Sequence, residues 1–176
     1  MVVLVLGFGP FGVVVDNPAR RLALASTGVV GACRVVGREM PVSYDRCEAV
    51  TLDAVRELAP AFVLGVGVAR TRAAAELESV GRNAATATES DVDGVALSDH
   101  GQGPPELPVQ HAEALARALG VPLSTDAGGY VCNSWLYRSL RAGLPAAFLH
   151  VPLEGFPPDR LRNALAAFVL ARSGLA

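Results

Sequence analysis

The first twenty residues, MVVLVLGFGPFGVVVDNPAR, carry three signals that together decide the fold. The aliphatic run Val2–Leu6 is unbroken, as expected for a strand that is buried on both faces. A glycine-rich loop follows at residues 7–12. Asn17 and Pro18 then predict the start of a helix, because asparagine is a favoured cap and proline suits the first turn. Strand, loop and helix in this order are the repeating unit of an α/β protein.

The same alternation of strands and helices continues along the chain. Aliphatic runs predict further strands at 32–40, 62–66, 121–125 and 146–151. Apolar spacing and stop signals predict further helices at 44–58, 109–119, 133–141 and 159–170. Residues 73–83 fit either a strand with Glu76 and Glu78 on one face or a poorly patterned helix, and residues 90–108 are expected to form a long surface loop. We therefore predict that residues 1–176 form a single domain, a three-layer α/β/α sandwich around a mostly parallel, twisted sheet.

Composition excludes several classes of protein. Hydrophobic residues make up 51% of the chain and charged residues 18%, which excludes a largely disordered chain. The net charge of -2 argues against a nucleic-acid partner or a polybasic membrane-surface contact. All 15 basic residues are arginine, so Schiff-base chemistry on lysine and a P-loop are excluded. The longest nearly apolar stretch, Leu58–Ala69, is too short to span a membrane and contains Pro60.

The cysteines and histidines indicate the cellular compartment of the protein and whether it binds a metal. The three cysteines are widely spaced and odd in number, which does not suggest a disulfide framework. We therefore expect free thiols and a cytoplasmic protein. No two histidines have the spacing of metal ligands, so we expect no metal and no other cofactor.

The loop Gly7-Phe8-Gly9-Pro10-Phe11-Gly12 matches a GxGxxG pattern after a strand. A dinucleotide site would need a helix to begin at this loop, yet the helix signals come only at Asn17 and Pro18. A nucleotide-binding oxidoreductase is therefore the weaker alternative, and a plain tight turn is another. Because the loop carries two phenylalanines, Phe8 and Phe11, we favour a third interpretation, in which they form the walls of a flat apolar pocket.

Cys132 lies between a glycine-rich turn and a helix expected to begin near Asn133. The free N–H groups and the dipole of a helix N-terminus lower the pKa of a thiol, and the same N–H groups can form an oxyanion hole. A buried structural cysteine is the alternative, and it fits Cys33 and Cys47 better. The position therefore makes Cys132 a candidate nucleophile.

His150 lies near the end of a predicted strand, where parallel sheets gather functional side chains. A histidine in the core is the alternative. A cysteine nucleophile needs an imidazole, and the imidazole needs a carboxylate that orients it. Glu76 or Glu78 could be that carboxylate, or both could belong to a solvated charged face.

Taken in order, four motifs resemble the pyroglutamyl peptidase I (pyrrolidone-carboxylate peptidase) family of cysteine exopeptidases. They are Gly7-Phe8-x-Pro10-Phe11-Gly12 with Asn17-Pro18; Gly65-Val66-Gly67-x-Ala69 leading to Arg72, Glu78 and Asn83; Asp126-Ala127-Gly128-Gly129-Tyr130-Val131-Cys132-Asn133; and Phe148-Leu149-His150-Val151-Pro152. The resemblance implies removal of N-terminal pyroglutamate from peptides through a thioester, and assembly as a homo-oligomer, a dimer or a tetramer.

The resemblance also assigns roles to residues. It implies that Cys132 is the nucleophile, His150 the general base and acid, and Glu78 rather than Glu76 the orienting carboxylate. The residues that match substrate-binding positions are Phe8, Phe11 and Tyr130 around the ring, Asn17 and Val68 near the lactam, and Arg72 near the catalytic site.

The chain departs from the family pattern after Asn83. The family usually reads Asp-Ala-Arg where this chain has Thr86-Ala87-Thr88, and the chain is shorter there. Thr71 also replaces a glycine that usually precedes the arginine. A catalytically weak or inactive member that binds pyroglutamyl or lactam ligands is therefore an alternative to the active peptidase.

Overall fold

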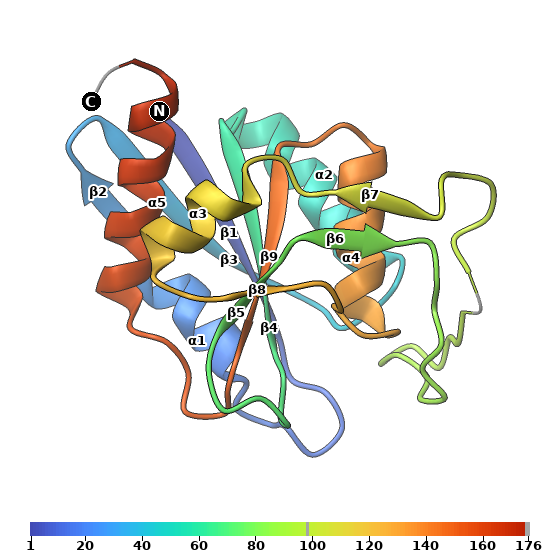
Figure 1. Cartoon of the computed structure of the whole chain (residues 1–176). Coiled ribbons are helices and arrows are strands. Elements are labelled where there is room, and N and C mark those ends of the chain that lie inside the picture. The colour runs from blue at the N-terminus through green and yellow to red at the C-terminus, as the bar shows by residue number, and fades with distance from the viewer. Residues whose placement is uncertain (98, 175–176) are drawn as a thin grey trace.

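β1 (Val2–Phe8) lies near the middle of a seven-stranded sheet in the computed structural model, which describes residues 1–97 and 99–174 (Figure 1). The strand order is β2 (Gly28–Val30), β3 (Cys33–Met40), β1, β4 (Phe62–Val68), β9 (Ala146–Val151), β5 (Glu76–Glu78) and β8 (Leu123–Ser124). β1 runs parallel to β3 and β4, and β4 runs parallel to β9. β2 and β5 run antiparallel to β3 and β9, so the sheet is mostly parallel, as predicted.

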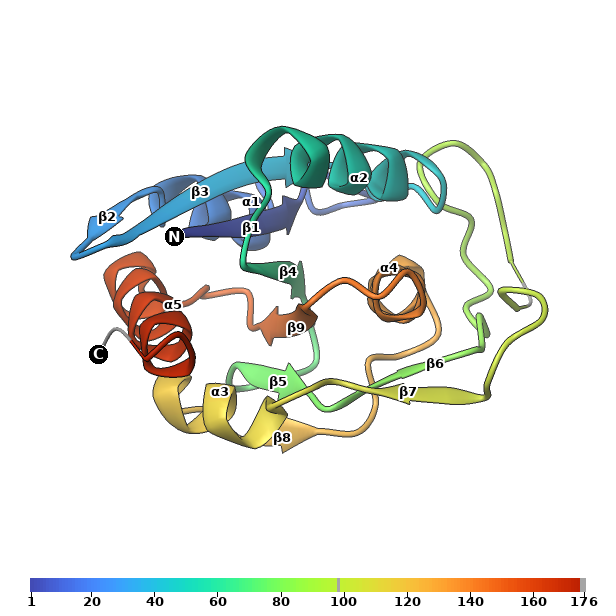
Figure 2. The same cartoon turned by 90° about the horizontal axis from the view of Figure 1, so that it is seen from above.

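Helices cover both faces of this sheet (Figures 1 and 2). On one face α1 (Pro18–Ala25) packs on β1 and β3, next to α5 (Pro158–Arg172), which in turn packs on α3 (Ala112–Leu119). On the other face lie α2 (Arg46–Leu58) and α4 (Val131–Arg141), which contact each other. A separate hairpin of β6 (Val80–Arg82) and β7 (Glu106–Pro108) packs beside α4. The predicted α/β sandwich is therefore confirmed.

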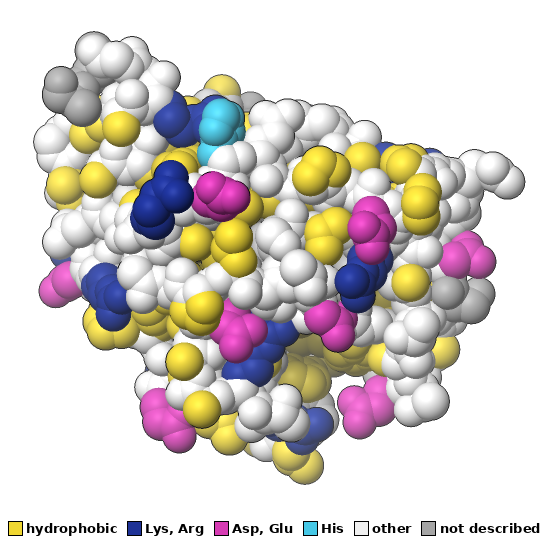
Figure 3. Space-filling model, viewed as in Figure 1, with side chains coloured by type: hydrophobic (Ala, Val, Ile, Leu, Met, Phe, Trp, Pro, Cys, Tyr) yellow, Lys and Arg dark blue, Asp and Glu magenta, His cyan; other side chains and the backbone are white. Residues whose placement is uncertain are grey.

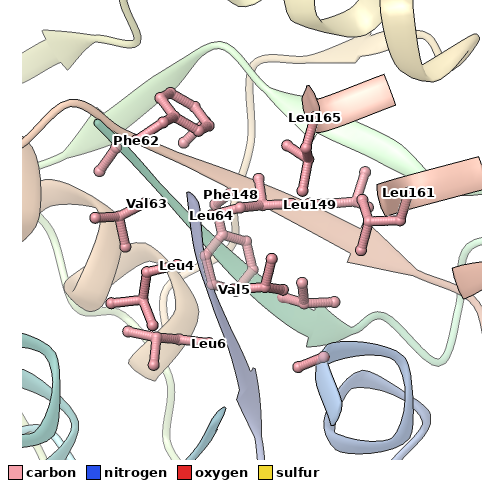
Figure 4. Packing of buried hydrophobic residues seen from close by; sticks show 14 of the residues in the cluster. Leu4, Val5, Leu6, Phe62, Val63, Leu64, Phe148, Leu149, Leu161 and Leu165 are labelled. Atoms are coloured by element: carbon pink, nitrogen blue, oxygen red, sulfur yellow. The ribbon is translucent and has the colours of Figure 1, made fainter. Parts of the chain in front are cut away.

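The core consists of the aliphatic side chains of β1, β4 and β9 and the apolar faces of the helices (Figure 4). Leu4, Leu64 and Phe148 are fully buried because helices cover both faces of their strands. At the end of β1, a Cβ on Gly7 would lie 2.2 Å from the backbone oxygen of Ala19. Glycine at this position therefore allows α1 to pack directly against the strand that supports the site.

Several boundaries of the elements differ from the predictions. Residues 73–83 contain strands rather than a helix, with Glu76 and Glu78 both in β5. The predicted loop at 90–108 is wrong at its end, because residues 106–108 pair with β6 as β7, and β2 was not predicted. α3 begins at Ala112 rather than at residue 109, since His111 has a φ of 60°, which a right-handed helix cannot contain.

The start of α4 has the largest consequence for the site. The helix begins at Val131, two residues before the predicted start at Asn133. Cys132 therefore lies within the first helical turn instead of before it. In the described ranges of the chain, no helix has both the length and the apolar character needed to cross a membrane.

Candidate active site

The carboxyl ends of β1, β4 and β9 meet at one edge of the sheet because the three strands are parallel. Gly67 of β4 and His150 of β9 are direct neighbours in the strand register. The N-terminus of α4 brings Cys132 to the same place, since a Cβ on Gly67 would lie 2.9 Å from the Cys132 sulfur. Glycine at position 67 therefore leaves the space that the thiol occupies beside the histidine strand.

Cys132 and His150 line the same pocket, which has a volume of about 210 Å³. Most of its other walls are apolar. Phe8 and Val68 end their strands at this pocket, and Phe11 and Tyr130 close it from the loops. The cysteine and the histidine, 18 positions apart in the sequence, thus face one small hollow.

His150 is held by Glu78. Its Nδ1 lies 2.7 Å from Oε1 of Glu78, and both side chains are almost completely buried. With Nδ1 engaged by the carboxylate, Nε2 is the ring nitrogen that remains for the pocket. Glu76 stands opposite His150 in the register of β5 and β9, but its carboxylate pairs with Arg72 instead.

Arg72 forms an ion pair with Glu78. The guanidinium lies 2.7 Å from Oε1 of Glu78 and 2.9 Å from Oε2 of Glu76, and it donates to the backbone oxygen of Asp126 at 2.6 Å. Burial acts to raise the pKa of Glu78, but the hydrogen bond and charge of His150 and the charge of Arg72 outweigh it and lower that pKa below its usual value. Glu78 is therefore a carboxylate at neutral pH. Arg72 supports it and does not itself line the pocket.

The thiol of Cys132 does not have the lowered pKa that its place at a helix N-terminus predicted. Burial raises the pKa to about 12, and the negative charge of Glu78 raises it further, against the opposing effects of its own backbone N–H and of Arg72. Desolvation of the thiolate therefore outweighs the helix terminus. The thiol is protonated in the free site, and an attack on a carbonyl carbon needs a base that takes its proton.

Aromatic contacts fix the walls of the pocket. The rings of Phe11 and Tyr130 have centroids 6.4 Å apart, and Tyr130 donates its hydroxyl to the backbone oxygen of Ser90 at 2.9 Å. Burial raises the pKa of Tyr130 to about 12, so the hydroxyl remains a donor. The Asn17 amide donates to the backbone oxygen of Gly9 and accepts from the N–H of Ala19, so it holds the loop that carries the phenylalanines.

A family model described as "Pyroglutamyl peptidase" matches residues 1–156. The chain belongs to this family. The chain is 33% identical to pyrrolidone-carboxylate peptidase of Pyrococcus furiosus over 168 residues, which cover 86% of this chain and 81% of the relative. It is 30% identical to the enzyme of Saccharolobus islandicus over 184 residues, which cover 97% of this chain and 88% of the relative.

Solved structures of pyroglutamyl peptidases have the same fold. A single-site variant of the Pyrococcus furiosus pyrrolidone carboxyl peptidase superposes with a TM-score of 0.83 at 25% identity over 100% of both chains. A structure from a study of the same enzyme and its cysteine-free mutant gives 0.83 at 26% identity, again over 100% of both chains. The chain is accordingly an enzyme, a peptidase of the cysteine type.

Five of the six residues that the resemblance placed at the substrate line the pocket of this protein; the exception is Arg72. Sequence reasoning missed further lining residues, namely Val42, Gly67, Arg70, Ala87, Glu89 and Ala127. Arg70 had a signal, since it lies two positions before Arg72 after the same strand. Ala87 and Glu89 flank Thr88, the position where an arginine was expected, so this segment does border the pocket.

Two observations bear on the metal-site and nucleotide-site hypotheses. Within residues 1–97 and 99–174, no three His, Cys, Asp or Glu side chains are grouped as metal ligands. α1 begins at Pro18, six positions after Gly12, so the glycine-rich loop does not open directly into a helix as a dinucleotide site requires.

Proposed function

We propose that the protein removes N-terminal pyroglutamate from peptides through Cys132, His150 and Glu78, with a thioester intermediate. The observation that carries this proposal is that Cys132 and His150 line one pocket and that Glu78 contacts His150. Cys132 and His150 line the same aromatic-walled hollow, and Glu78 holds the far nitrogen of the imidazole at 2.7 Å. The order of sulfur, imidazole and carboxylate is the order that nucleophilic catalysis by a thiol requires.

The reaction starts when the sulfur of Cys132 attacks the carbonyl carbon that follows the lactam ring. The thiol proton passes to Nε2 of His150, and the Glu78 carboxylate stabilises the imidazolium that forms. The N–H of Cys132 lies in the first turn of α4, where helical N–H groups have no intrahelical partner, so it can donate to the oxyanion. Collapse breaks the C–N bond, and the leaving amine takes the proton from His150.

The thioester that remains is cleaved by water. His150 takes a proton from the water while the oxygen bonds to the carbonyl carbon, and the C–S bond then breaks. The sulfur recovers its proton from the imidazolium, and free pyroglutamate leaves.

The walls of the pocket suit the substrate. Pyroglutamate has no free amine, so its recognition requires flat apolar surfaces and backbone partners rather than a carboxylate that binds an ammonium. Phe8, Phe11 and Tyr130 provide the surfaces, and the backbone near Val68 lies where lactam groups can bind. Asn17 keeps a free lone pair on its oxygen, but its main contribution is to hold the loop.

A second candidate is a family member that binds pyroglutamyl ligands without cleaving them. Two observations favour it: the thiol of Cys132 is protonated in the free site, and threonine stands at position 88 in place of the expected arginine. A pyroglutamyl chromogenic substrate, assayed with and without a thiol-blocking reagent, separates the two. Cleavage that the reagent abolishes supports the peptidase, whereas binding of the substrate without product release supports the second candidate.

Phe11→Ala is expected to raise KM by roughly 10 to 100-fold, because the ring loses about 1.5–3 kcal/mol of apolar contact. The change in kcat should be smaller, since Phe11 does not touch the reacting atoms. Steady-state kinetics on a pyroglutamyl substrate measure both constants. Val15→Ala on the same loop is the control, because Val15 is 79% exposed and should keep the wild-type KM. An unchanged KM in Phe11→Ala would remove Phe11 from the substrate pocket.

A cytoplasmic location and assembly into a dimer or tetramer are part of the proposal. All three cysteines are free thiols, which suits a reducing compartment. The oligomeric assembly rests on the family resemblance alone.

A further inference from the structure

A second hollow adjoins the pocket that holds Cys132 and His150. Its volume is about 490 Å³, and it shares four wall residues with the first pocket: Phe11, Arg70, Glu89 and Tyr130. A substrate that places its pyroglutamyl ring in the first pocket must continue past the scissile bond. The second hollow adjoins the first and offers space into which the rest of the substrate could continue.

Arg70 stands where the two hollows meet, and the backbone fixes it there. The N–H of Ala69 donates to the backbone oxygen of Val151 at 2.9 Å, and the N–H of Arg72 donates to the backbone oxygen of Ala69 at 3.1 Å. These two bonds hold a turn at the end of β4 against the end of β9. The two arginines of this turn have different surroundings. Arg72 forms an ion pair with the buried Glu78, whereas Arg70 is exposed and lines both hollows.

The guanidinium of Arg70 is available to a ligand. Among the residues that the structure describes, it has neither an ion-pair partner nor a hydrogen-bond partner. Arg72, two positions later, shows the contrast, since it binds two carboxylates and a backbone oxygen. The pyroglutamyl ring is neutral and needs no cation. The nearest anionic group that a short substrate can present is a carboxylate on the residue after the scissile bond.

Two acidic side chains, Glu89 and Asp91, line the second hollow together with Arg70. The Asp91 carboxylate accepts the N–H groups of Tyr44, Asp93 and Val95, so its oxygens are occupied by the backbone. Glu89 lines both hollows and has no ion-pair partner in the described part of the chain. Its charge opposes an incoming carboxylate, whereas Arg70 attracts it.

We propose that Arg70 determines specificity on the leaving side of the scissile bond by binding a carboxylate of the residue that follows pyroglutamate. This inference rests on the proposed function. It predicts a preference for pyroglutamyl dipeptides with a free carboxylate over substrates in which that carboxylate is an amide. A guanidinium forms charge-assisted, bidentate contacts with a carboxylate, which gives the preference its chemical basis.

The test compares three substrates: pyroglutamyl-alanine, pyroglutamyl-alanine amide and pyroglutamyl-aspartate amide. In Arg70→Gln, kcat/KM for pyroglutamyl-alanine is expected to fall by about tenfold, while the value for the alanine amide stays within about twofold of wild type. The aspartate amide distinguishes a main-chain carboxylate from a side-chain carboxylate. In wild type, the preference for the free carboxylate should weaken as salt is added, because the contact is exposed.

Two further variants sharpen the result. Glu89→Gln should increase kcat/KM for pyroglutamyl-alanine, opposite in sign to Arg70→Gln. Arg34→Gln removes the same charge from the far end of the sheet, where Arg34 pairs with Val2 in the strand register, and should change none of the three values. Equal losses on all three substrates in Arg70→Gln, or no loss on any, would overturn the inference. If wild-type protein cleaves none of them, the proposed function fails, and the inference fails with it.

Discussion

Cys132→Ala is expected to abolish the cleavage of pyroglutamyl substrates, with kcat/KM reduced by at least about 10⁴-fold. Cys132 is the one cysteine among the described residues that line the pocket, and His150 beside it is engaged by Glu78. Circular dichroism and thermal unfolding should show an intact fold, because the substitution removes one sulfur from a side chain that borders a cavity. The residual activity of Cys132→Ala is measured as product formation at high enzyme concentration.

Cys47→Ala and Cys33→Ala are the matched controls for this result. Both thiols are buried, at 1% and 0% exposure, in the helix and strand that flank β1. Burial raises the pKa of Cys47 to about 12, the value that also applies to Cys132, so acidity does not distinguish the two. What distinguishes Cys132 is its place in the pocket with His150. If Cys33→Ala lost activity and Cys132→Ala kept it, the nucleophile would be misassigned.

The parts of this protein that the sequence predicts well are those fixed by local pattern. The run Val2–Leu6 is aliphatic on both faces, so only a strand between two layers of helices buries it fully. Asn17 caps α1 as expected, since its side chain accepts the N–H of Ala19. Because parallel strands end at one edge, Phe8 and His150 could be placed together before their contacts were known.

The parts that escaped prediction depend on contacts between distant segments. The pKa of Cys132 follows from its burial and from Glu78, and neither can be read from the glycine-rich turn beside it. β7 exists only because residues 106–108 meet β6, which lies more than twenty positions earlier in the chain. Arg70 and Arg72 differ in role because of the turn that holds them, although the two residues are identical in type.

The sequence establishes the number of charged residues, 15 basic and 17 acidic, and a net charge of -2. Figure 3 shows acidic and basic side chains interspersed over the face of the molecule that is seen in Figure 1. The functional charges are different in kind. Glu78 has 0% exposure, and Arg72 reaches it from a half-buried position. Their effect depends on desolvation, which composition does not report.

The second large effect is expected for Glu78→Gln, which should lower kcat/KM by roughly 10³-fold. The glutamine amide can donate to Nδ1 of His150, and that would place the ring proton on Nε2, where the thiol proton has to be received. It also removes the charge that stabilises the imidazolium. KM should change little, since Glu78 does not line the pocket. Kinetics on a pyroglutamyl substrate separate the two constants.

Glu76→Gln is the control. It removes a carboxylate that lies on the same strand and also pairs with Arg72, but it leaves the 2.7 Å contact between Glu78 and His150 in place. Its activity should stay within about tenfold of wild type. Equal losses in the two variants would mean that the carboxylates act only by neutralising Arg72, and His150 would then have no specific orienting partner.

The pH dependence of stability provides a second test of Glu78 that does not use catalysis. Its pKa is lowered in the folded protein, so the carboxylate contributes stability above the unfolded value of 4.5, and this contribution is lost as the pH falls through the lower folded value. The Glu78→Gln variant lacks this contribution to the free energy of unfolding. The stability of wild type relative to Glu78→Gln, measured by denaturant unfolding, should therefore decrease as the pH is lowered below about 4.5. A difference that stays constant through this range would mean that the pair with His150 and Arg72 does not hold the charge, and the orienting role of Glu78 would lose its electrostatic basis.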